Sequence, residues 1–145
     1  MSLKLEYQYY KSPYGWYSLV YPEFWETEVI EGIPAFFDPE GTGALLVSAF
    51  QNLEGEYHLQ TELARFLSQH NVEYEEDSIA KFTNNEGCNI LACEFISDNR
   101  FWMVYMLSKK DKLIVCSYNS DESPDNELST ILTTIISSIK VIEHE

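Results

Sequence analysis

The feature that most constrains the fold is an apolar stripe near the end of the chain. Its members recur at spacings of three and four residues: Leu128, Ile131, Leu132, Ile135, Ile136 and Ile139. Because this spacing follows the repeat of an α-helix, it predicts a helix whose apolar face packs on a sheet. Ser123 is the predicted N-cap and Pro124 the predicted first helical residue. The opposite face carries only serine and threonine. We expect that face to be solvated, with docking of a partner or a second subunit as the alternative.

The first half of the chain reads as strands followed by a second helix. Segments 3–10 and 16–21 alternate in a strand-like way and predict an opening hairpin turned at residues 12–15. Three further strands are predicted at residues 28–30, 35–38 and 44–50. The apolar spacing then changes at Leu59, Leu63, Phe66 and Leu67, which predicts a helix over residues 58–70 that crosses the sheet.

Four strands in a meander are predicted between the two helices, at residues 79–83, 88–97, 101–108 and 112–118. In the third of these strands both alternating sets of side chains are apolar, which is typical of a strand covered on both faces. The length of 145 residues is the commonest size for one domain. We therefore expect a single α+β domain over residues 1–145.

The charge balance limits the classes of partner. The chain has 24 acidic and nine basic residues, a net charge of −15, and its 45% hydrophobic content indicates a folded domain. Since each phosphate contact needs a lysine or arginine, nucleic acid and anionic membranes are poor partners. A partner held by long-range charge would be another protein with a basic surface. Homodimerisation remains open.

Targeting signals and cysteine spacing bear on the compartment. No segment approaches the roughly 18 apolar residues of a membrane span, and the first residues lack the apolar run of a signal peptide. We expect a cytoplasmic protein, with a removed signal or lipoprotein peptide as the alternative. Cys88, Cys93 and Cys116 lie in predicted strands without the paired spacing of zinc or redox motifs, so we expect buried, reduced thiols.

An aromatic strand that ends in Tyr-Pro and is followed closely by a tryptophan occupies residues 17–25. Together with the strand at 43–48 and the helix end at 136–140, it resembles the PsbP-like superfamily, which includes the PsbP subunit of photosystem II and the Ran guanine-nucleotide-release factor. The chain looks most similar to bacterial members of unknown or chaperone-like role. The resemblance implies one antiparallel sheet of about six to eight strands with helices packed on its faces, an α/β/α sandwich. It also implies action through protein contacts rather than catalysis. No residues here match a motif for the Ran-binding or photosystem roles, so neither is carried over.

No set of residues builds a recognisable catalytic, cofactor or metal site. His58 and His70 would not converge on one helix, and the acidic runs at 73–77 and 121–127 lack the pattern of a calcium loop. We interpret these runs as solvated loops, with a basic partner or adventitious divalent binding as alternatives. Glu94 is the one acid in an otherwise apolar set of strands; we expect a lysine partner or exposure at an edge, and the alternative is a catalytic carboxylate. The prediction is a protein that is not an enzyme and holds no cofactor.

Aromatic residues crowd the first 25 positions, and strand alternation requires some of them to lie on the surface. Tyrosine- and tryptophan-rich patches are typical of protein interfaces and sugar sites. The candidate partner-binding residues are Tyr14, Trp16, Phe24 and Trp25, and ordinary core and surface positions are the alternative. The first hypothesis is a non-enzymatic protein-interaction or adaptor/chaperone-like domain that uses an acidic, aromatic-rich surface or an uncovered sheet face. The second is a small-molecule or carbohydrate-binding protein that uses the N-terminal aromatic cluster.

Overall fold

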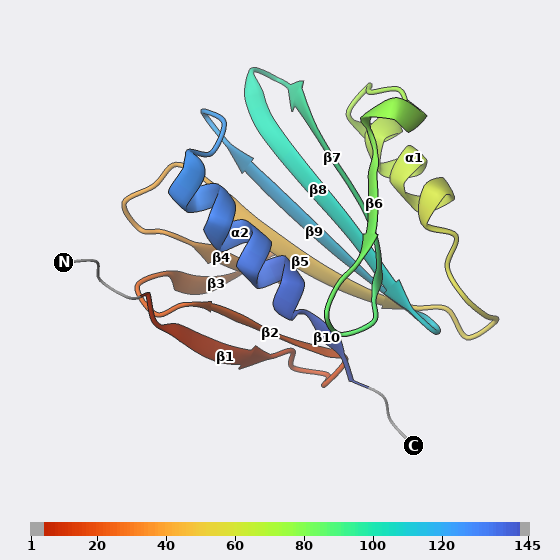
Figure 1. Ribbon diagram of the computed structural model, residues 1–145, viewed down its shortest axis with the longest axis horizontal. Coiled ribbons are helices and arrows are strands. Elements are labelled where there is room, and N and C mark those ends of the chain that lie inside the picture. Colours follow the sequence, from red (N-terminus) through yellow and green to blue (C-terminus); the bar gives the residue numbers. More distant parts are fainter. Residues whose placement is uncertain (1–4, 143–145) are drawn as a thin grey trace.

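Two antiparallel sheets and two α-helices make up residues 5–142, the part of the chain that the computed structural model describes (Figure 1). The large sheet has seven strands, in the spatial order β3 (Glu26–Ile30), β4 (Ile33–Phe37), β5 (Ala44–Gln51), β9 (Lys112–Ser120), β8 (Arg100–Lys109), β7 (Asn89–Ser97) and β6 (Ala80–Thr83). The small sheet has three, in the order β1 (Tyr7–Lys11), β2 (Tyr17–Pro22) and β10 (Lys140–Val141). Residues 1–4 lie outside the described residues. They include the first residues of the predicted opening strand and the start of the segment in which a signal peptide was not expected.

The small sheet departs from the expected single sheet. The opening hairpin forms as predicted, but β2 pairs with β10, which follows the last helix, through Ser18–Lys140 and Tyr17–Val141. The hairpin therefore lies across one face of the large sheet instead of extending it. A strand of two residues gives no alternation in the sequence, so neither β10 nor this pairing could be predicted.

Helix α2 (Asn126–Ser138) packs on the same face as the small sheet (Figure 1). The predicted stripe is confirmed, because Ile131, Leu132, Ile135, Ile136 and the adjoining Ile139 are buried in the larger core cluster, with Leu128 half-buried against it. The rest of that cluster comes from β2 and β10 of the small sheet and from β4, β5, β7, β8 and β9 of the large sheet. Packing of this face therefore decides where the helix lies.

The start of α2 differs from the prediction. Asp125, not Ser123, is the N-cap, and its Oδ1 accepts the N–H of Leu128 at 2.8 Å. Pro124 precedes the cap and is not helical. On the polar face, Ser138 Oγ accepts the N–H of Val20 at 3.0 Å. This end of the serine and threonine face therefore contacts β2 of the small sheet.

Helix α1 (Leu59–Gln69) packs on the other face, against β7 and β8. Leu63 and Leu67 are buried there with side chains from three strands, Leu91, Val104, Met106 and Leu113. Helices thus lie on both faces of the large sheet, as predicted, and β8 is covered on both sides. A short 3-10 helix, η1 (Glu76–Ser78), leads into β6. Neither helix within residues 5–142 has the length and apolar character needed to cross a membrane.

Candidate functional site

The four aromatic residues predicted for partner binding lie at two separate places. Tyr14 is 82% exposed in the turn between β1 and β2, and its ring centroid lies 6.1 Å from that of the half-buried Trp16. Phe24 is 46% exposed in the turn after β2. Trp25 is only 4% exposed and belongs to the core. Trp25 is therefore not an exposed contact residue, and its predicted part in partner binding stays a prediction. The pair Tyr14 and Trp16 and the pair Phe24 and Trp25 line different cavities.

Phe24 and Trp25 line a cleft of about 400 Å³ between the turn after β2, the loop that joins β4 to β5, and the start of α2. We call it the acidic cleft. Its lining includes the four acidic residues Asp38, Glu122, Asp125 and Glu127. Tyr118 and Ile131 add an aromatic and an aliphatic side chain, and no lysine or arginine within residues 5–142 lines it. The run at 121–127, interpreted from the sequence as a solvated loop, is one wall of this cleft.

Two of the cleft carboxylates are held in place by the backbone, and their charges influence the buried Tyr118. Asp38 Oδ1 accepts the N–H of Glu40 at 2.9 Å and Asp125 Oδ1 accepts that of Leu128, so local backbone bonds hold both side chains in place. Burial is the main cause that raises the pKa of Tyr118, and the charges of Asp125 and Asp38 add to the rise. A hydrogen bond with Ser120 and the charge of Arg100 act in the opposite direction. The four carboxylates of the lining, with no basic side chain among the described lining residues, favour a positively charged ligand.

Gly43 lets the loop between β4 and β5 approach β9 closely. A Cβ atom built at this position would overlap the Oη and Cζ atoms of Tyr118 and lie 2.8 Å from the Cβ of Ser120. Because Tyr118 is buried, its ring has little room to move away. In the sequence, residues 41–43 fall between two predicted strands, and a close contact with a residue so much later in the chain leaves no local signal.

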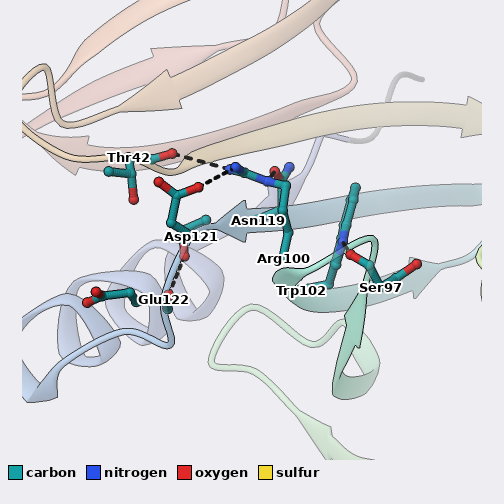
Figure 2. A network of polar contacts seen from close by, with 8 residues as sticks. Thr42, Ser97, Arg100, Trp102, Asn119, Asp121 and Glu122 are labelled. Carbon is teal, nitrogen blue, oxygen red and sulfur yellow. Dashed lines mark hydrogen bonds and ion pairs between the residues drawn. The ribbon is translucent and has the colours of Figure 1, made fainter.

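Arg100 does not line the cleft, but its side chain bonds to Thr42 in the lining and to residues next to it (Figure 2). Its Nε donates to Asn119 Oδ1 at 2.8 Å, and its two terminal nitrogens contact Asp121 Oδ1 at 2.6 Å and the carbonyl oxygen of Thr42 at 3.3 Å. One guanidinium thus joins the start of β8, the end of β9 and the loop after β4. In the sequence, Arg100 falls between the strands predicted at 88–97 and 101–108, and no local pattern predicts these contacts.

Trp25, one of the residues that line the cleft, carries an unpaired donor in its indole ring. Its Nε1 is buried and has no hydrogen-bond partner within the described range. A buried N–H without an acceptor costs about 1–3 kcal/mol, so such groups are uncommon in folded proteins. Residues 5–142 provide no acceptor for this donor.

Tyr14 and Trp16 line the second cavity, which we call the apolar groove. It has a volume of about 410 Å³, and its apolar lining includes Val29, Ile33, Pro34 and Phe50. Lys112 Nζ lies 5.6 Å from the centroid of the Trp16 ring, a cation–π contact that helps to hold the ring in place. Ser12 Oγ accepts the N–H groups of Trp16 and Tyr17 at 2.9 and 3.3 Å, which fixes the turn that carries Tyr14.

The remaining suspects from the sequence do not assemble into a site. His58 precedes α1 and His70 follows it, where the His70 ring lies against Phe66, Phe95 and Trp102. No group of three or more histidine, cysteine, aspartate or glutamate residues in the described part of the chain could hold a metal ion.

The three thiols are free, as predicted. Cys88 and Cys116 are buried, whereas Cys93 is half-buried. Burial raises the pKa of Cys93 to about 11, with a smaller contribution from the charge of Glu94, so its thiol is protonated at neutral pH. Glu94 itself is exposed on the part of β7 that extends past the end of β6, which confirms the expected exposure at an edge.

Residues 5–145 match the model of a family described as a domain of unknown function (DUF3805), and the chain belongs to that family. No curated protein matches the chain. The solution structure of cyanobacterial PsbP (CyanoP) from Synechocystis sp. PCC 6803 is similar, with 17% identity over 95% of this chain and 94% of that one, and a TM-score of 0.70. A crystal structure from Bacteroides thetaiotaomicron VPI-5482 matches with 18% identity and a TM-score of 0.65. That match covers 94% of this chain and 48% of the Bacteroides protein, so this chain spans about half the length of that relative. The fold is PsbP-like, as the resemblance in the sequence predicted.

Proposed function

We propose that this DUF3805 domain is a non-enzymatic protein-interaction domain that binds a basic segment of a partner protein in the acidic cleft. The observation that carries the proposal is the lining of the cleft, which combines four acidic residues with exposed Phe24 and includes no basic side chain among the described residues. A lysine or arginine entering the cleft would form charge-assisted contacts with the carboxylates and stack on an aromatic ring.

The rest of the molecule supports the same partner chemistry. A net charge of −15 attracts a basic protein over long range and speeds its encounter with the cleft. Arg100 and the caps formed by Asp38 and Asp125 hold the walls before any ligand arrives, so binding has little chain entropy to offset. An adaptor or chaperone-like role is what such binding would provide, and it rests on the resemblance to PsbP-like proteins of that kind.

Removing charge from the cleft should weaken binding of a basic probe. We expect Glu122→Gln combined with Glu127→Gln to raise the Kd of a labelled arginine-rich peptide about fivefold or more, which corresponds to about 1 kcal/mol. Both side chains are exposed, so the substitutions should leave the fold intact. Fluorescence anisotropy at low and physiological salt measures the change, and binding should weaken as salt rises.

The matched control is Glu54→Gln combined with Glu56→Gln. It removes the same two charges from an exposed loop that does not line the acidic cleft. We expect this control to bind the peptide nearly as well as the original chain. Equal weakening in both double variants would show that net charge alone attracts the peptide, and would contradict the proposal.

A second candidate function is the binding of a small molecule or carbohydrate in the apolar groove. The observation that favours it is a concave, mostly apolar cavity beside exposed Tyr14, as is usual for ligand pockets. If a thermal-shift screen finds a sugar that raises the melting temperature, Tyr14→Ala combined with Trp16→Ala should abolish that rise, compared with the variant's own baseline. The Glu122→Gln, Glu127→Gln variant should retain it. A rise that survives the loss of both aromatic rings would place the ligand elsewhere.

A further inference from the structure

We propose that the outer edge of β7 accepts an extended, basic strand of a partner protein, which adds to the large sheet beyond the end of β6. This site is separate from the acidic cleft and does not depend on the function proposed for it. The observations that carry it are an incomplete strand pairing, backbone groups without partners, an adjoining groove and the charge around that groove.

Strand β6 covers only the first part of β7. Their pairing runs from Thr83–Asn89 to Ala80–Ala92, whereas β7 continues to Ser97. Over residues 93–97, β7 has β8 on one side, and no strand within residues 5–142 pairs with it on the other (Figure 1). In Figure 1, β6 and β7 lie side by side at the start of β7 and diverge toward its end, in line with a pairing that stops at Ala92.

The hydrogen-bond pattern identifies which backbone groups face outward. Asn84 N–H donates to Cys88 O at 3.1 Å, so Cys88 and every second residue after it direct their N–H and C=O toward the β6 side. Beyond β6 these residues are Glu94 and Ile96, and the described part of the chain offers their backbone groups no hydrogen-bond partner. The backbone N–H and C=O groups of Cys93 and Phe95 point toward β8 instead. A row of unpaired N–H and C=O groups is a template for another strand.

A groove of about 370 Å³ lies between this edge and the segment after α1. Its apolar lining is Leu67, Val72, Ile79, Cys93 and Phe95, and its acidic lining is Glu73, Glu75 and Glu94. An added strand would direct alternate side chains to opposite faces of the sheet. One set would enter the groove beside Cys93 and Phe95, and the other would lie beside Glu94 and the 75% exposed Ile96. This arrangement fits a segment that alternates apolar residues with lysine or arginine.

The acidic residues around this edge favour a basic strand over a second copy of this chain. A second copy of this chain would bring another Glu73, Glu75 and Glu94 and another net charge of −15 to the same edge, which disfavours self-addition. A basic strand would neutralise these carboxylates while its backbone pairs with Glu94 and Ile96. Residues 89–92 of the β7 edge already pair with β6 and cannot accept another strand. Lys81 of β6 forms an ion pair with Glu76.

The test uses a short peptide of alternating valine and lysine and follows backbone amides by NMR and hydrogen exchange. In the free protein the amides of Glu94 and Ile96 should exchange at least about tenfold faster than those of Cys93 and Phe95. Saturation with the peptide should slow exchange at Glu94 and Ile96 by a similar factor. A peptide methylated on alternate backbone nitrogens should not bind, nor should one that alternates valine with glutamate.

A proline at position 96 removes one of the backbone N–H groups that would bind the added strand. Ile96→Pro deletes an outward N–H that the fold does not use, whereas Ile96→Ala keeps it and is the matched control. The proline variant should lose peptide binding and the alanine variant should retain most of it. If the amides of Glu94 and Ile96 are already protected in the free protein, if the methylated peptide binds equally well, or if the peptide perturbs only the acidic cleft, the proposal is wrong. The methylated peptide keeps the test decisive even if the proline variant does not fold.

Discussion

Ile135→Asp should leave the protein without a stable fold. Ile135 is fully buried in the middle of α2, where it faces the large sheet. Loss of its apolar side chain costs about 2–5 kcal/mol, and desolvation of a carboxylate adds several more. That sum is comparable with the whole stability of a typical domain, about 5–15 kcal/mol. Soluble yield and circular dichroism melting measure the effect.

Thr133→Asp is the matched control, because Thr133 is exposed on the same helix. An aspartate there should change the free energy of unfolding by less than about 1 kcal/mol. If Ile135→Asp melted at nearly the temperature of the original chain, the helix would not lie on the core as described. Equal loss of folding in both variants would point instead to a general intolerance of α2 to charge.

Local periodicity explains how much of the fold could be predicted. The α2 stripe and the strands of the meander each follow from residues close together in the chain, and the structure confirms them. Choices between neighbours were less secure: Ser123 and Asp125 can both cap a helix, and only the geometry shows that Asp125 Oδ1 reaches the N–H of Leu128. The pairing of β2 with β10 joins segments at opposite ends of the chain, so no local pattern carries it.

The candidate site shows the same limit more strongly. The sequence identified Phe24 and the acidic run at 121–127, but not that they line one cleft. Arg100 joins Thr42 and Asp121, residues 58 positions before it and 21 after it in the chain. The free edge of β7 could not be foreseen because it depends on where β6 ends. Glu94 was the only local signal, as an acid in an otherwise apolar strand that required a charged partner or exposure.

Gly43→Ala should destabilise the protein and disturb the acidic cleft. The new Cβ would overlap the buried ring of Tyr118 and crowd Ser120 on the same strand, so either the loop or β9 must shift. Overpacking of this kind costs about 1–3 kcal/mol, which corresponds to a fall in melting temperature of about 3–10 °C for a chain of this size. Differential scanning calorimetry measures the fall, and the anisotropy assay with the arginine-rich peptide measures the effect on the cleft.

Gly41→Ala separates crowding from loss of a glycine. It lies in the same loop, and the nearest atom to its new Cβ would be Asp38 O at 3.5 Å, an ordinary contact. Neither glycine has a positive φ, so an alanine brings no backbone strain at either position and the two variants differ in available space. We expect Gly41→Ala to change stability by less than about 0.5 kcal/mol and to leave peptide binding unaltered. Equal melting temperatures for the two variants would mean that the loop does not approach Tyr118 closely in solution. The cleft would then be wider, its carboxylates farther from a bound cation, and its preference for a basic segment weaker than proposed.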